Sequence, residues 1–351
     1  MNKTFRDYGL DMLRIISICG VVAIHVFGLR VGSEAKEGRG WWAAVAIDIG
    51  FIWVVPVFVM ISGALLLGSR QAISAPMNFY GKRASRLVPA LIIWNAVYLI
   101  GVRIWMRHEE LSGARVLQLI YDGSVFTQLY FLWLIVGLYA ITPILATFFA
   151  EASQRRVLVT AGVFLAATVL AYMAPGILGY FEVSRPISTN IFTYWIPFVG
   201  YFVAGYALRS VRLRGIALIA VSIVTAALIV FTIWHFGHRG VFPWADRLFS
   251  ISYLGAGVAA MAIGVFVVGL SVSKFIKVPD RAGTVLVSLS NASFGVFLVH
   301  LVIFETIRLN VPAVLAADSF PAIAVAYIVT LLGSFLVSLI ALKVPLLRRV
   351  F

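Results

Sequence analysis

The stretch LRIISICGVVAIHVFG, residues 13–28, decides how this chain folds. It belongs to an apolar run long enough to cross a ~30 Å hydrocarbon core as a helix, yet it carries Arg14 and His25. Their eleven-residue spacing places the two side chains about 20° apart around a helix and ~16 Å apart along it. Ionisable groups in a membrane helix face a protein interior or a watery cavity by default. The alternative is that Arg14 reaches back to lipid headgroups and His25 hydrogen-bonds a neighbouring carbonyl.

Apolar runs of this kind recur along the whole chain. The sequence is 62% hydrophobic and 12% charged, whereas soluble domains are about 45–50% apolar and about 25% charged. The runs do not alternate polar and apolar residues, as the strands of a membrane β-barrel would. We therefore expect an all-α polytopic membrane protein that forms one domain over residues 1–351. About ten spans are predicted, at residues 10–30, 43–68, 87–106, 128–149, 157–174, 190–208, 215–236, 248–270, 291–309 and 321–342.

The net charge of +14 is explained by its distribution between the two sides of the membrane. With ten spans both termini share one side, and that side holds 17 of the 28 Lys and Arg residues but four of the 14 acidic ones. The far side holds ten of each. Because basic loops stay in the cytoplasm, both termini are predicted to be cytoplasmic, and nucleic acid is not an expected partner. The single cysteine, Cys19, excludes an intrachain disulfide.

Other ionisable residues in the predicted spans are candidates for a site. Asp48 lies near the start of the second span, at a depth similar to that of His25, where its carboxylate would orient the imidazole. Alternatively, Asp48 is only an acidic residue in the first turn of its helix. His300 is either a second polar group in the same cavity or a hydrogen-bonded core histidine. His235 and His238 have a spacing that suits a metal, but no cysteine or third ligand lies nearby in the sequence, so no metal is predicted.

Motifs of soluble enzymes are missing, and several classes of function remain. The sequence has no Walker loop, dinucleotide fingerprint, H-E-x-x-H or G-x-S-x-G. Arg and His inside spans serve membrane enzymes, but they also line the substrate paths of transporters. Many transporters carry internal repeats, and none is evident here. An enzyme and a transporter or translocase of a lipid-linked glycan therefore both remain open on these residues. A third class is a non-catalytic assembly subunit, in which Arg14 and His25 would tolerate substitution.

Five ordered blocks carry a family resemblance. They are Asp11 with the Arg14–His25 pair, VPVFVMISGALL (55–66), KRASRLVPAL (82–91), QLYFLWLIVGLYAITPIL (128–145) and SFGVFLVH (293–300). In this order they resemble the signature elements of the membrane-bound acyltransferase 3 family. The sequence differs from the usual family pattern at Ala64, Gln128, Tyr130 and Phe297, and the first three bear on the choice of acceptor.

The resemblance implies an O-acetyltransferase of the bacterial inner membrane, expected without the extracytoplasmic hydrolase-like domain that some members append. It would move an acetyl group from cytoplasmic acetyl-CoA to a hydroxyl of a cell-envelope or lipid-linked glycan. Guanidinium and ammonium groups suit the phosphates of CoA, and an imidazole suits the removal of a hydroxyl proton near neutral pH. The expected roles are acyl-donor binding by Arg14, Lys82, Arg83 and Arg86, catalysis by His25 with Asp48, and substrate contact by Ser62, Tyr130 and His300.

Overall fold

The computed structural model describes residues 8–33 and 38–351, and within them the chain forms helices and no strands. Nine helices in these ranges are long and apolar enough to cross a membrane, which confirms the predicted all-α polytopic fold. They are α1 (Gly9–Val31), α2 with α3 (Gly38–Gly50 and Val54–Leu66), α5 with η1 (Pro76–Ala96 and Val97–Met106), α7 (Tyr130–Phe149), α8 (Gln154–Tyr180), α10 (Gly215–Gly237), α12 (Ala256–Val272), α13 (Asp280–Asn310) and α15 (Phe320–Ala341).

Shorter helices complete the described chain. They are α4 (Arg70–Ser74), α6 (Gly113–Tyr121), η2 (Ile196–Phe198), α9 (Val199–Leu208), α11 (Pro243–Leu248), η3 (Ser273–Phe275), α14 (Pro312–Leu315) and η4 (Leu347–Arg349).

The predicted span at 190–208 is shorter in the structure than in the prediction. Its helix covers Ile196–Leu208, which is ~20 Å long at 1.5 Å per residue. Upstream, the Asn190 side chain accepts a hydrogen bond from the Phe192 backbone N–H at 3.0 Å, and Thr193 Oγ1 accepts one from the Asn190 N–H at 2.9 Å. Such local bonds compete with helix formation. Pro197 then stands at the helix start, where its missing N–H costs nothing.

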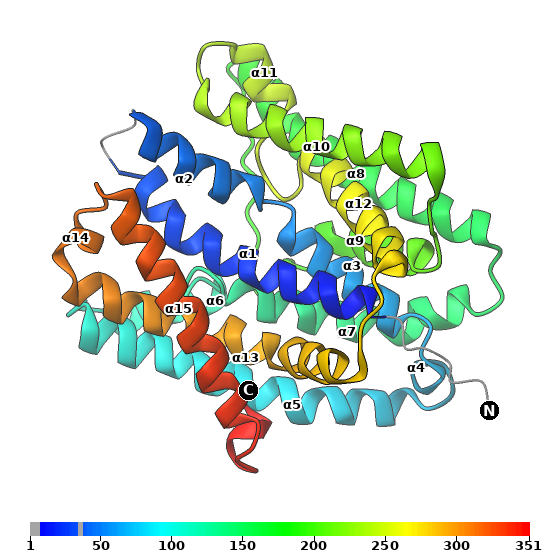
Figure 1. The fold of residues 1–351 in the computed structure, drawn as a ribbon, viewed down its shortest axis with the longest axis horizontal. Helices are drawn as coiled ribbons and strands as arrows, with labels where there is room; N and C mark the ends of the chain where they lie inside the picture. Colours follow the sequence, from blue (N-terminus) through cyan, green and yellow to red (C-terminus); the bar gives the residue numbers. More distant parts are fainter. Residues whose placement is uncertain (1–7, 34–37) are drawn as a thin grey trace.

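The loops divide between the two ends of the helices, as an alternating topology requires. Figure 1 shows the connections α3–α5, α7–α8, α9–α10 and α12–α13 toward the end where α1 begins. The connections α8–η2, α10–α12 and α13–α15 lie toward the opposite end. Lys3, Arg6, Asp7, Glu34, Lys36 and Glu37, which count in the charge balance, lie outside the described residues. That the α1 start faces the cytoplasm stays a prediction from the positive-inside rule.

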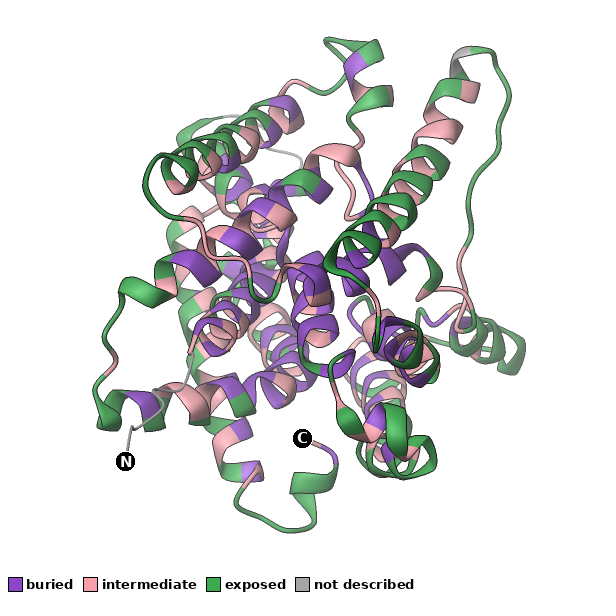
Figure 2. Cartoon of the chain, turned by 90° about the vertical axis from the view of Figure 1, so that its right-hand side faces the viewer, coloured by how far each residue is buried: buried purple, intermediate pink, exposed green. Residues whose placement is uncertain are grey.

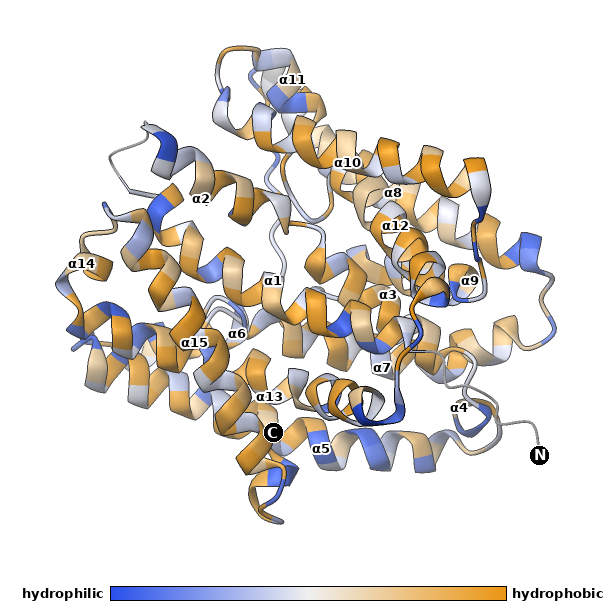
Figure 3. Ribbon diagram, viewed as in Figure 1, coloured by the Kyte–Doolittle hydropathy of each residue, from blue (hydrophilic) through white to orange (hydrophobic). Residues whose placement is uncertain are grey.

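The surface carries the apolar side chains that a lipid environment requires. Buried residues gather at the centre of the bundle and exposed residues at its edge (Figure 2). Helix α10 is apolar almost throughout (Figure 3), and its Ile216, Ile219 and Ile223 are exposed by 87%, 59% and 63%. In water such a face would be an aggregation hazard. In a bilayer it is the expected lipid-facing surface.

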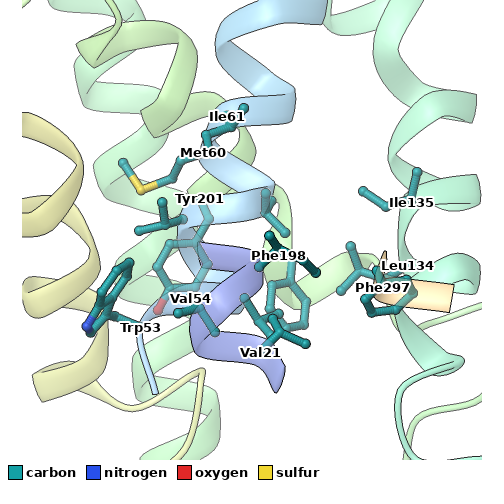
Figure 4. Close-up of a cluster of buried hydrophobic side chains, with 14 of the residues drawn as sticks. Val21, Trp53, Val54, Met60, Ile61, Leu134, Ile135, Phe198, Tyr201 and Phe297 are labelled. Carbon is teal, nitrogen blue, oxygen red and sulfur yellow. The ribbon is translucent and has the colours of Figure 1, made fainter. Parts of the chain in front are cut away.

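Close packing of α3 on α9 fixes one wall of the bundle. A Cβ at Gly63 would overlap the backbone carbonyl of Phe202, and a Cβ at Gly205 would overlap that of Met60. Small residues let membrane helices approach to this distance. The same buried cluster includes apolar side chains of α1, α3, α7, α9 and α13 (Figure 4). Gly63 is therefore required for the helix packing, while the adjacent Ser62 turns to a cavity described below.

Candidate active site

The face of α1 that carries Arg14 and His25 lines a cavity of about 930 Å³ between α1, α3, α5, α7 and α13. We call it the inner cavity. Its volume is within the ~300–1,000 Å³ range of small-molecule sites. The structure brings into it most of the predicted site residues, together with others from distant parts of the chain. Its polar and charged lining comprises Arg14, His25, Ser62, Lys82, Arg83, Arg86, Thr127, Gln128, Tyr130, Tyr139, Tyr253, Ser290, Asn291, Ser293 and Arg348.

Basic side chains dominate the charge of the inner cavity. Five basic residues line it, and no Asp or Glu is among its lining residues in the described part of the chain. Arg14 Nη1 donates to Ser290 Oγ at 3.3 Å, so α13 holds this guanidinium in place. The Arg83 guanidinium lies 5.6 Å from the Tyr139 ring centre, and that of Arg86 lies 5.3 Å from the Phe294 ring centre. Aromatic faces stabilise these cations while leaving their N–H groups for an anion.

A second, smaller cavity meets the first at His25. Its volume is about 430 Å³, and its lining combines the end of η1, the segment before α7, and the C-terminal part of α13. We call it the outer cavity. His25 and Thr127 line both cavities. The imidazole of His25 therefore stands where a group entering from either end would meet it.

His300 lies against His25 rather than in either cavity. The two ring centres are 5.3 Å apart, and His300 is fully buried. Its Nδ1 lies 2.8 Å from the Phe297 carbonyl oxygen and 3.1 Å from that of Val296. Because a carbonyl oxygen only accepts, Nδ1 carries the proton and donates. Its Nε2 makes no hydrogen bond to the described residues.

Asp48 lies close to the site without touching His25. Its carboxylate packs against Gly28, three residues beyond His25 on α1, and it lines neither cavity. No hydrogen bond joins Asp48 to His25 among residues 8–33 and 38–351. Burial raises the pKa of the Tyr253 phenol to about 12, and the nearby Asp48 charge acts in the same direction. The role of Asp48 as the orienting partner of His25 stays a prediction.

Ser62 and Tyr130 both lie on the wall of the inner cavity. The Ser62 hydroxyl donates to the Phe58 carbonyl at 3.0 Å, which leaves its oxygen lone pairs for another group. The Tyr130 ring packs 5.5 Å from the Tyr194 ring. Both side chains are thus placed to contact a bound molecule.

Several lining residues were not singled out by the sequence. In the sequence, Arg348 contributes only to the positive charge that predicts a cytoplasmic C-terminus. In the structure, η4 places it on the wall of the inner cavity. Trp94 Nε1 donates to the Val350 carbonyl at 2.9 Å and holds this segment against α5. Thr127 and Tyr253 lie in irregular segments. Such segments have no periodic pattern that predicts which side chains point inward.

The two histidines considered as metal ligands do not form such a site in the described residues. His235 Nε2 lies 3.5 Å from an Asp246 carboxylate oxygen, and the His238 Nδ1 lies 2.8 Å from the Trp234 carbonyl oxygen. No group of three His, Cys, Asp or Glu residues placed to hold a metal ion occurs in 8–33 or 38–351.

The fold and the site together define a multi-pass membrane protein with a basic cavity that ends at the half-buried His25. The sequence matches the acyltransferase domain family known as acyltransferase 3 over residues 7–339, and the chain belongs to this family. Comparison with curated proteins found no match, and comparison with solved structures found none either. The protein is a membrane acyltransferase by family, with Arg14 and His25 on the cavity-lining face of its first span.

Proposed function

We propose that the protein is an O-acetyltransferase of the bacterial inner membrane. It moves the acetyl group of cytoplasmic acetyl-CoA to a hydroxyl of a cell-envelope or lipid-linked glycan on the other side. One observation carries the proposal: His25 lines both the inner and the outer cavity. A base at this junction serves a reaction whose two substrates arrive from opposite ends.

The inner cavity suits the acyl donor by charge and by shape. CoA carries several phosphates, and Lys82, Arg83, Arg86 and Arg348 supply cationic N–H groups for them. Between these cations and His25 the wall is mostly apolar, with Phe58, Leu65, Leu66, Phe131, Leu132, Ile135, Phe294 and Phe297. The pantetheine arm is long and largely apolar, so it fits this stretch. Arg14 stands beside the path, held by Ser290.

The reaction at His25 is a transfer of the acetyl group from sulfur to oxygen. The unprotonated ring nitrogen of His25 takes the proton of the acceptor hydroxyl as its oxygen attacks the thioester carbonyl. The C–O bond of the new ester forms, the C–S bond breaks, and CoA leaves as the thiolate. His25 then returns the proton to the thiolate sulfur, so that CoA departs as the thiol and the imidazole is regenerated.

Neighbouring side chains position the reacting groups. His300, anchored to its own helix through Nδ1, packs on the His25 ring and limits its rotation. Ser62 and Tyr130 line the inner cavity near the reaction path and contact the substrates. Their hydroxyl groups can bind the thioester or the sugar, as donors or as acceptors.

The rival function is a transporter or translocase for a lipid-linked glycan. Two cavities that meet in the membrane also suit a transport path. Membership of an acyltransferase family weighs against it, as does the concentration of basic residues in the inner cavity, which suits a polyanionic acyl donor.

Labelled acetyl transfer tests the proposal. Purified protein is incubated with acetyl-CoA labelled in the acetyl group and with crude envelope glycan from the cells that make it. We expect label in glycan with the wild type and with His238→Ala, a control histidine outside both cavities. His25→Ala is expected to lose transfer by at least ~100-fold, as removal of a general base implies. If folded wild-type protein labels no glycan with either acetyl-CoA or succinyl-CoA, the result contradicts the acetyltransferase and favours a transporter or translocase.

A further inference from the structure

The outer cavity has a charge pattern that the acyl donor does not explain. Three arginines and one carboxylate line it beside His25: Arg103, Arg107, Arg308 and Glu305. The CoA phosphates are accounted for by the inner cavity, at the other end of the site. The outer cavity is where an acceptor must approach His25, so its charges bear on what the acceptor is.

The outer arginines form one ion-pair network with two carboxylates. Arg103 Nη2 lies 2.7 Å from a Glu109 carboxylate oxygen, and Arg107 Nη1 lies 3.6 Å from the other oxygen of the same group. Arg107 also reaches Glu305, with its Nη2 2.9 Å from one oxygen and its Nε 3.0 Å from the other. The network thus joins three guanidinium groups with two carboxylates and retains one uncompensated positive charge.

Arg308 is the member of the network with binding capacity to spare. Its Nε and Nη2 both donate to the same oxygen of Glu305, at 3.2 and 2.9 Å. Its Nη1 makes no hydrogen bond to the residues that the structure describes, and the side chain remains 22% exposed in a cavity wall. The Glu305 carboxylate is 5% exposed and already receives two arginines. A cation in such a confined place is stabilised by an anion.

A π-helix brings the two other arginines to the cavity. Residues Val97–Met106 form η1, and the Arg107 N–H bonds the Val102 carbonyl five residues back at 2.9 Å. Arg103 lies within this π-helix and Arg107 follows its last residue. At a spacing of four residues the two side chains share one face, as they would in an α-helix too. π-Helices are rare and occur frequently at functional sites. Two of the three arginines of the outer cavity thus lie at the end of an uncommon backbone form.

We propose that the outer cavity binds an anionic group of the acceptor, a carboxylate or a phosphate, through Arg308 and Arg107. This inference rests on the proposed function. The anionic group is either the carboxylate of an acidic sugar or the phosphate that joins a glycan to its lipid. Its binding holds the neighbouring hydroxyl toward His25, which lines the same cavity. A neutral free glycan lacks this contact and is a poor substrate.

The other reading is that the network only braces η1 against α13. A brace would make Arg308 important for folding but indifferent to the charge of the acceptor. The two readings therefore differ in how variants respond to acidic and neutral acceptors, and this difference can be measured in the intact enzyme.

The first stage locates the label. Glycan labelled by the wild-type enzyme is separated by anion exchange into neutral and acidic fractions. Label in acidic material supports the proposal, and label confined to neutral material overturns it. If no fraction carries label, it is the proposed function that fails, because the charge of an acceptor matters only when there is transfer.

The second stage identifies the source of the charge. Reduction of carboxyl groups to alcohols before the assay abolishes acceptance if the anion is an acidic sugar. Mild acid hydrolysis of glycosyl phosphates, with the carboxyl groups left intact, abolishes it if the anion is the lipid-linking phosphate. Acceptance that survives both treatments overturns the proposal.

The third stage assigns the contact. Arg308→Gln keeps hydrogen-bonding ability but removes the charge, and we expect it to raise KM for the acidic acceptor roughly tenfold to a hundredfold. Its KM for acetyl-CoA should stay unchanged. Arg308→Lys should keep KM within a few fold. Arg115→Gln, an exposed arginine of α6 that lines neither cavity, is the matched control. Unchanged KM in Arg308→Gln, or an equal rise with Arg308→Lys, would overturn the assignment.

Discussion

His25 and His300 come from helices at opposite ends of the sequence, yet their imidazole rings lie 5.3 Å apart with an angle of 39° between the planes. His300 is fixed by two carbonyls of its own helix, whereas His25 opens to both cavities. In the proposed reaction, His300 is thus the buried residue that supports the imidazole of His25, and His25 is the group that the substrates reach. This division makes different predictions for the two residues.

Substitution of His300 should slow turnover without removing the base. We expect His300→Ala to lower kcat by about tenfold to a hundredfold, because misorientation of a catalytic group costs on that scale. His300→Gln, which retains a donor for the Val296 and Phe297 carbonyls, should recover part of the loss. Steady-state kinetics in detergent or nanodiscs measure this, with KM for acetyl-CoA expected to remain unchanged. A His300→Ala enzyme as fast as the wild type would rule out the positioning role.

The basic residues of the inner cavity should control the affinity for the acyl donor. Arg83→Gln and Arg86→Gln are each expected to raise KM for acetyl-CoA by about tenfold, because each removes a charge-assisted hydrogen bond to phosphate. Arg348→Gln should act in the same direction, since η4 places it on the same wall. Arg349→Gln is the control, as this neighbour lines neither cavity.

Inhibition by desulfo-CoA, a CoA analogue without the thiol, is a second test of this prediction. Desulfo-CoA should inhibit the wild type competitively with acetyl-CoA and should inhibit these three variants less. Equal inhibition of the wild type and all three variants would mean that the phosphates bind elsewhere.

Gly63 should be essential for packing rather than for chemistry. Gly63→Leu places a side chain where the Phe202 backbone already lies, so we expect a loss of about 1–3 kcal/mol or more in stability. Gly162→Leu is the matched control, because this helical glycine of α8 has no neighbouring atom within 4 Å of an added Cβ. The thermal unfolding of both variants in detergent is the measurement. A Gly63→Leu protein as stable as Gly162→Leu would contradict the close α3–α9 contact.

The orientation in the membrane can be tested with single cysteines. Cys19 is the one cysteine of the chain, so a Cys19→Ala background allows new ones to be placed at Ser153, between α7 and α8, and at Ser112, before α6. In intact cells a membrane-impermeant maleimide should label the cysteine at position 112 but not that at position 153. The reverse pattern would invert the predicted topology. Labelling of both positions after permeabilisation shows that both are reactive.

The fold was predictable from the sequence to the extent that apolar length decides it. The run around Leu13–Gly28 and its counterparts gave the membrane helices, because lipid leaves the backbone few alternatives to a helix. The late start of the helix predicted at 190–208, which begins at Ile196, and the π-helix at Val97–Met106 were not predicted. Both depend on local hydrogen bonds and on packing, which hydropathy does not encode.

The site was predictable where the helical period applied. Arg14 and His25 share a face because eleven residues make nearly three whole turns, and they line one cavity. By contrast, the contact of His25 with His300 joins helices far apart in the chain, and no spacing rule reports it. The contact of Asp48 with His25 was predicted only from their similar depth in the membrane, and depth does not determine the direction of a side chain.

Acetyl transfer across a sealed bilayer tests the central claim most directly, namely that the two substrates reach His25 from opposite ends. The enzyme is reconstituted in vesicles that enclose envelope glycan, and labelled acetyl-CoA is added outside. Enzyme molecules whose basic inner cavity faces outward can bind it. We expect label on the enclosed glycan with the wild type and none with His25→Ala. In a second experiment, enzyme molecules of the opposite orientation are selectively inactivated, and glycan is supplied on the same side as acetyl-CoA. This glycan should receive no label. Equal labelling when both substrates are on the same side would contradict a histidine reached from both ends.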